Sequence, residues 1–314
     1  MCGIVGYVGT PGQSKPALGV VIDALRRMEY RGYDSAGIAL LDGSGGMAVE
    51  KKAGKLDNLV ATVESAGLEN YPATTGIGHT RWATHGRPTD INAHPHVDQL
   101  GKIAVVHNGI IENFAPLHAE LEAQGVEFTS ETDTETVTHL LHAEYYGEGP
   151  NAGNFTASVM AVINRLEGAF TLVIAHADHP DMLMACRRST PLVIGVGEHQ
   201  MFLGSDVAAF IEHTREAVEL GQDNVVTITA DGYTITDFEG NPVEGRPFTI
   251  DWDLEAAEKC GYDYFMLKEI AEQPQALADT LRGHFVDGRI VLDERRLSDE
   301  DLRQIEKIFV VACG

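Results

Sequence analysis

Apolar residues follow two alternating periods along the first 170 residues of the chain. Leu18, Val21, Ile22, Leu25 and Met28 recur about every 3.6 positions, which predicts a helix over residues 16–30. The same spacing predicts helices over residues 56–65, 113–125, 132–146 and 157–166. Apolar runs predict strands over residues 2–8, 37–43, 47–54, 76–83 and 102–111. Helices and strands therefore alternate through this half of the chain.

From residue 169 onward the pattern is rich in strands. Apolar runs predict strands over residues 169–177, 181–188, 192–198 and 200–206, then a helix over 207–220. Asp231-Gly232 lies between two alternating segments and predicts a β-hairpin. Thr132 and Glu135 have the spacing of a capping box at a helix start. The whole pattern predicts two packed sheets covered by helices, with a long polar loop over residues 84–101.

Near residue 242 the pattern changes to a linker, followed by helical stretches. The last residues, "LRQIEKIFVVACG", predict a helix that leads into an apolar strand without a partner, as expected of a fragment whose next domain is missing.

Amino-acid composition limits the classes of partner that the chain can bind. The 314 residues are 44% hydrophobic and carry 23 basic against 47 acidic side chains, a net charge of −24. This charge repels phosphate backbones and anionic membranes, so we expect neither nucleic-acid nor membrane binding. The apolar runs are shorter than the roughly 20 residues of a membrane span, and no signal peptide precedes residue 2, so we expect a cytoplasmic protein. The four cysteines (Cys2, Cys186, Cys260, Cys313) are dispersed, which favours neither disulfides nor a thiolate zinc site.

Cys2 stands directly behind Met1. Most cysteines among Ile, Val and Gly are small buried hydrophobes, and reactivity is the minority case. Removal of Met1 would give Cys2 a free α-amine beside its thiol. The amine titrates near pKa 8 and the thiol near 8.5, so the amine can accept the thiol proton at neutral pH. Cys2 is therefore a candidate nucleophile that carries its own base.

Polar, Gly-punctuated segments follow the predicted strands: "YRGYDSAGIA", "HTRWATHG", "NAHPH", "VHNGIIEN" and "ETDTE". With Cys2, they resemble the glutamine amidotransferases that use an N-terminal cysteine nucleophile. "RRMEYRGYDSAG", "KEIAEQP" and the terminal "ACG" are most similar to the branch that aminates fructose 6-phosphate to glucosamine 6-phosphate. The resemblance implies an α+β fold, a four-layer αββα sandwich of the N-terminal-nucleophile hydrolase type, without cofactor or metal. It implies a glutaminase domain over residues 1–242, and a linker with the truncated start of a sugar-isomerase domain over 243–314.

The resemblance assigns chemical roles. Cys2 attacks the side-chain amide of L-glutamine, forms a γ-glutamyl thioester and releases ammonia. Asn108 and Gly109 supply the oxyanion hole, although Asn-Gly alone is more often a tight turn. Arg81 binds the α-carboxylate with its planar fork and Asp133 pairs with the α-ammonium. For Asp133 alone, stabilisation of the first turn of a helix is the more common role.

The remaining implied roles concern the walls of the site. Trp82, Thr84 and His85 resemble the family's glutamine-covering loop, with Trp82 as lid and gate to an ammonia tunnel, although a Trp at a strand end is usually part of the core. The resemblance also places His94 among the substrate-binding residues. Arg31 resembles a residue that organises the surroundings of the nucleophile, and a structural salt bridge is equally compatible with its position.

Three other interpretations stay open. The histidine-rich stretch (His79, His85, His94, His96, His107) is compatible with a zinc hydrolase, because His94-x-His96 can chelate a metal. A non-catalytic glutamine-binding module would keep Arg81 and Asp133 but would not need Cys2. Within the family, amidotransferases that act on phosphoribosyl pyrophosphate or in asparagine synthesis are the alternatives. For the favoured branch we expect fructose 6-phosphate to bind only through the missing C-terminal domain, and the full-length enzyme to be a homodimer.

Overall fold

The computed structural model describes residues 2–32, 34–82, 86–251, 262, 264–281, 285–286, 289–290, 298, 300, 303–307 and 309. The chain forms two compact units, Met1–Glu258 and Lys259–Gly314. The first unit contains two large antiparallel sheets and carries all the site residues discussed below.

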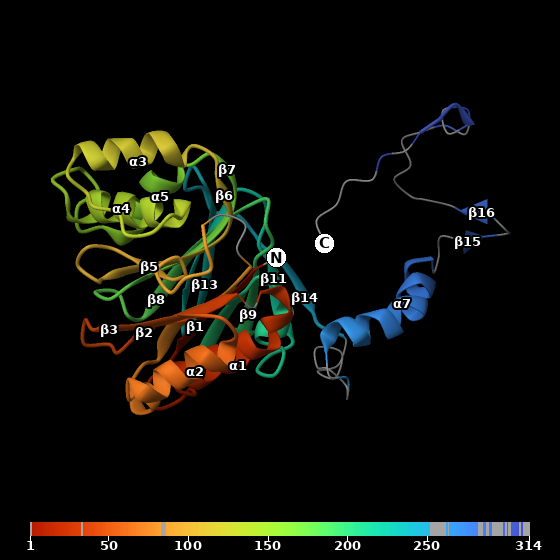
Figure 1. Cartoon of the computed structure of the whole chain (residues 1–314), viewed down its shortest axis with the longest axis horizontal. Helices are drawn as coiled ribbons and strands as arrows, with labels where there is room; N and C mark the ends of the chain where they lie inside the picture. The colour runs from red at the N-terminus through yellow and green to blue at the C-terminus, as the bar shows by residue number, and fades with distance from the viewer. Residues whose placement is uncertain are drawn as a thin grey trace. The chain divides into compact units, whose positions relative to one another are not determined.

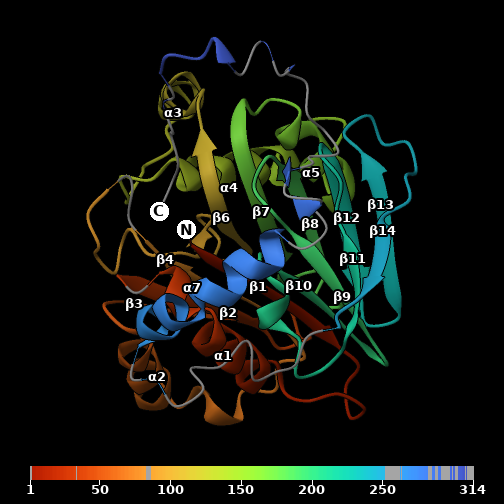
Figure 2. The same cartoon turned by 90° about the vertical axis from the view of Figure 1, so that its right-hand side faces the viewer.

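The first sheet has the order β14 (Arg246–Thr249), β11 (Glu216–Glu219), β9 (Val193–Gly197), β10 (Gln200–Gly204), β1 (Gly3–Gly9), β4 (Thr75–Arg81), β2 (Ser35–Leu41), β3 (Met47–Ala53). The second has the order β13 (Gly232–Asp237), β12 (Asn224–Thr229), β8 (Met182–Arg188), β7 (Gly168–His176), β6 (Ile103–Ile111), β5 (His96–Val97). Figure 2 shows β6, β7, β8 and β12 running side by side.

Helices cover the outer faces of both sheets. The first sheet carries α1 (Ala17–Arg27) and α2 (Leu56–Ser65), and the second carries α3 (Phe114–Ala123), α4 (Asp133–Tyr146) and α5 (Phe155–Ile163). Three short 3₁₀ helices, η1 (Glu29–Arg31), η2 (Leu68–Asn70) and η3 (Val207–Ala209), join these elements. Figure 1 shows helix, sheet, sheet and helix stacked in that order. The predicted four-layer αββα sandwich is confirmed.

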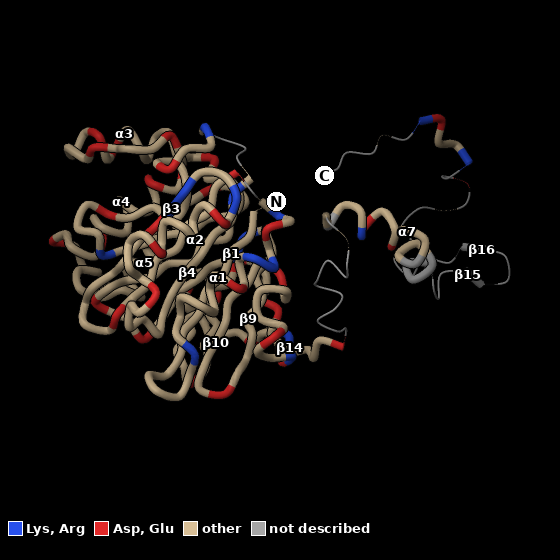
Figure 3. The backbone as a smooth tube through the Cα atoms, turned by 60° about the horizontal axis from the view of Figure 1, so that its bottom comes forward, with Lys and Arg blue, Asp and Glu red and all other residues tan. Residues whose placement is uncertain are grey.

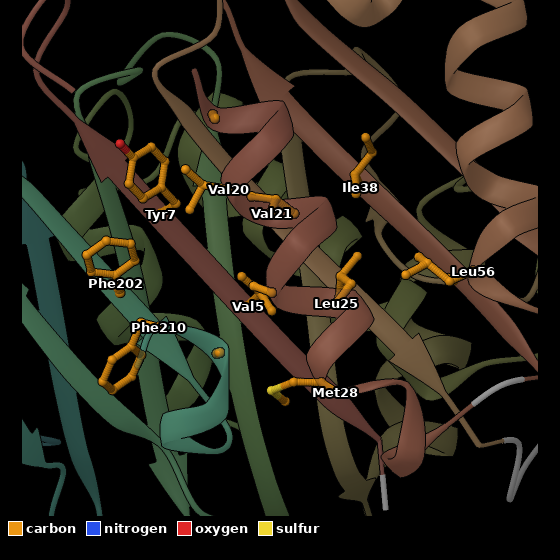
Figure 4. Close-up of a cluster of buried hydrophobic side chains, with 14 of the residues drawn as sticks. Val5, Tyr7, Val20, Val21, Leu25, Met28, Ile38, Leu56, Phe202 and Phe210 are labelled. Atoms are coloured by element: carbon orange, nitrogen blue, oxygen red, sulfur yellow. The ribbon is translucent and has the colours of Figure 1, made fainter. Parts of the chain in front are cut away.

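Strand β1 is buried on both faces, as its apolar sequence predicts. Val5 and Tyr7 pack against α1, whose Val21 and Leu25 lie on the inner face of that helix (Figure 4). The alternate residues, including Ile4, point to the second sheet and join the apolar layer between the sheets. The nucleophile candidate therefore precedes a strand that is buried at every position.

Residues 207–220, predicted to be helical, are not a helix. They form η3, a turn and the strand β11, which pairs with β9 and β14. The Thr214 hydroxyl donates to the carbonyl of Val196 and accepts the N–H of Glu216 at 3.1 Å, which redirects the chain into the sheet. Ala217 and Val218 are then buried by sheet neighbours, so tertiary packing outweighs local helical periodicity.

The predicted start of α4 is confirmed, but the capping box is not. Thr132 is the N-cap residue and its side chain makes no cap hydrogen bond. Its hydroxyl lies 2.9 Å from Nε2 of His96 instead. The Glu135 carboxylate accepts the N–H groups of Thr129 at 2.9 Å and Ser130 at 2.6 Å. Glu135 thus binds the backbone of the loop before the helix and makes no capping-box hydrogen bond to the N-cap residue.

The predicted hairpin is confirmed as β12–β13, in which Gly232 has a positive φ of 157°. The strand β14 lies beyond residue 242 and still pairs within the first unit, which extends to Glu258. The domain assignment at residue 242 stays a prediction.

The second unit is described only in part. It contains α7 (Phe265–Leu281), with Pro274 inside the helix, and the pair β15 (Phe285–Val286) and β16 (Arg289–Ile290). Most of the predicted terminal strand lies outside the described residues. Among the described residues, no helix is both long and apolar enough to cross a membrane. Acidic side chains are spread along the chain, for example over α3 and α4 (Figure 3).

Candidate active site

The site forms where the start of β1 meets the end of β6, so each sheet contributes one part. Cys2 immediately precedes β1 in the first sheet, and Asn108 lies on β6 in the second. The Asn108 side-chain Nδ2 donates to the carbonyl oxygen of Cys2 at 3.0 Å. A candidate nucleophile and an amide donor, 106 positions apart in sequence, are therefore direct neighbours.

The Cys2 thiol is partly buried against the strand end of β4. The backbone N–H of Trp82 donates to Sγ at 3.2 Å, and the thiol lies 3.6 Å from the Trp82 carbonyl oxygen. Burial raises the pKa of the Cys2 thiol, while the Trp82 hydrogen bond and the Arg81 charge oppose that shift. The thiol is protonated at neutral pH, so its use as a nucleophile requires a base.

Cys186 has a different environment. It is fully buried among apolar residues, and burial raises the pKa of its thiol to about 12. A buried thiol of this kind is unreactive. Cys260 and Cys313 lie outside the described residues.

Asn108 and Gly109 lie inside β6, not in a turn, so the tight-turn interpretation is wrong. Gly109 has a φ of +123°, a conformation that side chains rarely adopt. A Cβ added there would clash with the carbonyl oxygen of Ala169 and lie 2.8 Å from the Cα of Phe170. The backbone at Gly109 is thus distorted and pressed against β7, where only glycine fits.

Asp133 is the first residue of α4 and its carboxylate faces the end of β6. Oδ2 accepts the N–H of Ile111 at 2.8 Å, and Oδ1 lies 3.6 Å from Nδ1 of His107 and 3.3 Å from the Thr134 hydroxyl. Burial raises the pKa of Asp133, but the contacts with His107, Ile111 and Thr134 outweigh burial and lower it to about 2. The helix start therefore presents a fixed negative charge.

Arg81 ends β4 and supplies a positive charge near Cys2, the candidate nucleophile. It is 5% exposed, and its Nη1 donates to the carbonyl of Arg87 at 3.4 Å. The Arg87 N–H in turn donates to Glu131, two positions before Asp133, at 3.2 Å. Trp82 follows with 47% of its surface exposed. Thr84 and His85 lie outside the described residues.

Four histidines form a buried layer behind these groups. The rings of His79 and His94 stack with centroids 4.4 Å apart, and His96 lies edge-on to His94 at 5.0 Å. Burial lowers the pKa of His79 to about 3 and that of His94 well below its usual value. His94 Nδ1 accepts the N–H of His107 at 3.2 Å, and Nε2 lies 3.4 Å from the Thr134 hydroxyl. Both ring nitrogens of His94 thus contact protein, which favours a supporting role over substrate binding.

The metal interpretation finds no support in the same layer. Among the described residues, no group of three His, Cys, Asp or Glu side chains is placed to hold a metal ion.

Arg31 forms a salt bridge, which is one of the two interpretations that its sequence position allows. Its Nη2 lies 2.8 Å from Oδ2 of Asp206. The adjacent Ser205 hydroxyl accepts the N–H of Ile4 at 3.0 Å, so this pair stands beside the start of β1. Its proposed influence on Cys2 stays a prediction.

Two residues that hold parts of the candidate site in place could not be recognised from the sequence. The Thr190 hydroxyl donates to the Asn108 carbonyl at 3.3 Å and is linked to the Thr171 hydroxyl at 2.6 Å. Asn92 holds the loop after β4: its Nδ2 donates to the Arg87 carbonyl and to Glu131, each at 3.0 Å. These contacts join distant segments, and neither a motif nor a periodicity marks them.

Comparison with known proteins agrees with this geometry. The family pattern described as a glutamine amidotransferase domain matches residues 79–212, a range that includes Arg81, Asn108 and Asp133. Residues 79–212 therefore belong to a glutamine amidotransferase domain. The glutamine–fructose-6-phosphate aminotransferase (isomerizing) of Mycolicibacterium smegmatis is 67% identical over 322 aligned residues, covering 100% of this chain and 50% of the relative. The enzyme of the same name from Streptomyces coelicolor is 58% identical, covering 100% and 49%.

The chain spans about half the length of the curated relatives it matches. Among solved structures, the glutamine phosphoribosylpyrophosphate amidotransferase of B. subtilis aligns with a TM-score of 0.63 and 23% identity, covering 77% of this chain and 50% of that one. This likeness supports the αββα fold of the amidotransferase domain.

Proposed function

We propose that the amidotransferase domain hydrolyses L-glutamine to glutamate and ammonia through a thioester on Cys2. The observation that carries the proposal is the pairing of Cys2 with Asn108 across the two sheets, 3.0 Å from Nδ2 to the Cys2 carbonyl. A sulfur nucleophile and an amide donor at one point are what acyl transfer from a carboxamide requires.

The chemical steps follow from the groups present. After removal of Met1, the α-amine of Cys2 takes the thiol proton, and the Trp82 N–H stabilises the sulfur as its charge develops. The thiolate adds to the side-chain carbonyl carbon of glutamine, and the resulting oxyanion accepts hydrogen bonds from Asn108 Nδ2 and the Gly109 N–H. The protonated amine then gives its proton to the departing ammonia, leaving a γ-glutamyl thioester. Water adds to the thioester with the amine again as base, releasing glutamate and restoring the thiol.

Recognition of the amino-acid end uses one charge of each sign. Asp133, held ionised at the start of α4, pairs with the α-ammonium, and Arg81 binds the α-carboxylate. In this proposal Trp82, Thr84 and His85 cover the bound glutamine, and Trp82 gates the exit of ammonia.

For the whole protein we propose the reaction that the relatives' name describes, transfer of the ammonia to fructose 6-phosphate with isomerisation, giving glucosamine 6-phosphate. The similarity over the full chain to the glutamine–fructose-6-phosphate aminotransferases supports this choice over the phosphoribosyl pyrophosphate branch. The sugar would bind in the half of the protein that follows this chain, with residues 243–314 as linker and start of that domain. We further propose a homodimer in the cytoplasm, where both substrates are metabolites.

The test is glutamate release by the purified chain, with Met1 removal verified by intact mass. We expect hydrolysis without sugar phosphate, one adduct at Cys2 from an electrophilic glutamine analogue, and no turnover in Cys2→Ala despite glutamine binding within a few-fold. Turnover in Cys2→Ala would refute the nucleophile, and loss of activity on chelation would favour the metal hydrolase. Stimulation of this chain by fructose 6-phosphate would place a sugar site within residues 1–314 and contradict the domain assignment.

A further inference from the structure

We propose that His79 is a positioning residue of the oxyanion hole: its Nε2–H holds the Asn108 side-chain amide with Nδ2 turned toward Cys2. This inference rests on the proposed hydrolysis of glutamine. It assigns a function to a histidine that the mechanism above does not use. His79 lies on β4 in the first sheet, so it reaches Asn108 across the interface between the sheets.

The contacts of the amide determine its orientation. One end of Asn108 lies 3.0 Å from Nε2 of His79, and the other lies 3.0 Å from the carbonyl oxygen of Cys2. A carbonyl oxygen only accepts, so the end facing Cys2 is the NH₂ group and the end facing His79 is the oxygen. Because that oxygen also only accepts, His79 Nε2 must carry the hydrogen. Both contacts thus require the same orientation of the amide and one tautomer of the histidine.

The surroundings of His79 keep the ring in place. The side chain is 1% exposed and its ring stacks on His94. On the backbone, His79 pairs with Ile4 of β1 on one side and with Gly37 of β2 on the other. Burial lowers the pKa of His79 to about 3, so the ring stays neutral over the pH range in which an enzyme of this kind works. A neutral imidazole with a fixed Nε2–H is a constant donor.

The chemical consequence concerns the sign of the dipole at the oxyanion. If the amide turned over, its oxygen would face the developing negative charge and repel it, instead of donating a hydrogen bond. In the resting site Nδ2 can relinquish the Cys2 carbonyl for the oxyanion while His79 retains the opposite end. His79 therefore acts through Asn108 and needs no contact with glutamine.

The experiment measures kcat and KM for glutamate release by His79→Leu and His79→Gln, each alone and combined with Asn108→Ala. Leu removes the donor, whereas the Gln side-chain nitrogen can take the place of Nε2. His176→Leu is the matched control, because His176 is fully buried on β7 opposite Ile103, at the other end of β6. We expect His79→Leu to lower kcat about 10²-fold with KM within about threefold, and His79→Gln to recover at least about tenfold of that loss. His176→Leu should leave kcat within about twofold.

In the Asn108→Ala background, His79→Leu should change kcat by less than about twofold, because its effect passes through the missing amide. An equal loss in both backgrounds, or full kcat in His79→Leu, overturns the proposal. If His79→Leu fails to fold, His79→Gln against His79→Asn decides, since the shorter amide cannot reach Asn108 and only Gln should keep kcat. An inactive wild-type protein would refute the proposed function instead. Even then, nitrogen NMR tests the geometry, because a His79 ring protonated at Nδ1 and bare at Nε2 would overturn the inference.

Discussion

Replacing Gly109 by alanine should both destabilise the amidotransferase domain and disable it. At a φ of +123° the new side chain would occupy a backbone region that is nearly exclusive to glycine, which costs about 1–3 kcal/mol. Its Cβ would also clash with the Ala169 carbonyl and lie 2.8 Å from the Cα of Phe170, both on β7. Overpacking of this kind costs a further 1–3 kcal/mol or so. We expect the free energy of unfolding to fall by about 2–6 kcal/mol.

Activity should fall in parallel, because relief of the clash requires β6 to move away from β7. The proposed oxyanion donors, Asn108 Nδ2 and the Gly109 N–H, move with that strand. A displacement of about 1 Å at a catalytic group can cost about 10²-fold in rate. We therefore expect kcat for glutamate release to fall about 10²-fold or more at temperatures where the variant remains folded.

Urea unfolding followed by circular dichroism, with kcat measured on the same preparation, checks both parts. Gly232→Ala is the matched control, since Gly232 has a φ of +157° but a Cβ there would meet nothing within 4 Å. That variant should lose only the backbone part of the stability and keep full kcat. A Gly109→Ala protein as stable and as active as Gly232→Ala would refute the role assigned to the contact with β7.

Four further outcomes are expected. Asn108→Ala should lower kcat about 10²–10³-fold with a smaller change in KM, and steady-state kinetics showing an effect on KM alone would make it a binding residue. Arg81→Ala and Asp133→Ala should each weaken glutamine binding by about 2–5 kcal/mol, measured by calorimetry in the Cys2→Ala protein, and unchanged affinity in both would remove the proposed charge pairs. The pKa of Asp133 is about 2 in the folded protein against about 3.9 in the unfolded chain, so ionised Asp133 stabilises the fold above pH 4 and this contribution is lost as the pH falls. The difference in free energy of unfolding between wild type and Asp133→Asn should therefore shrink by up to about 2–3 kcal/mol between pH 6 and pH 2. The pKa of His79 is about 3 in the folded protein, so its ring stays neutral where the imidazole of the unfolded chain already binds a proton. The free energy of unfolding should therefore fall below pH 6.5 by up to about 1.4 kcal/mol per pH unit. In His79→Gln the same free energy should fall less steeply with pH.

Local periodicity predicted most elements of the fold. Helix α2 was predicted at Leu56–Ser65, where the structure has it, because its apolar face repeats without interruption. Residues 207–220 were predicted wrongly because Val207, Phe210 and Ile211 have helical spacing. Only the sheet neighbours β9 and β14 show why Ala217 and Val218 adopt a strand. The information that decides this segment lies in residues distant along the chain.

In the candidate site, too, some residues could be predicted from local sequence and others could not. Motifs mark Cys2, Arg81, Asn108 and Asp133. The structure places Cys2 beside Asn108 and the Asp133 carboxylate against the end of β6, while the chemical roles of all four stay predictions. The partners that orient them were not predicted. The contact of His79 with Asn108 depends on side-chain direction across packed layers, which one sequence does not encode locally. The hydrogen bond that Glu135 accepts from Thr129 likewise replaces the capping box that the sequence predicts.

The apolar layer between the sheets sets the distance between Cys2 and Asn108, the proposed nucleophile and oxyanion donor. Cys2 precedes a strand of one sheet and Asn108 lies within a strand of the other, so the thickness of the packing between the sheets fixes the distance between the proposed nucleophile and the proposed oxyanion donor. Small side chains, Ala39, Ala104, Ala175 and Ala185, belong to that layer. A larger side chain in place of one of these alanines would push the sheets apart and change kcat, although the substituted residue lies in the core and not in the proposed site. Selection on catalysis would then constrain core volume as tightly as it constrains the groups that touch glutamine.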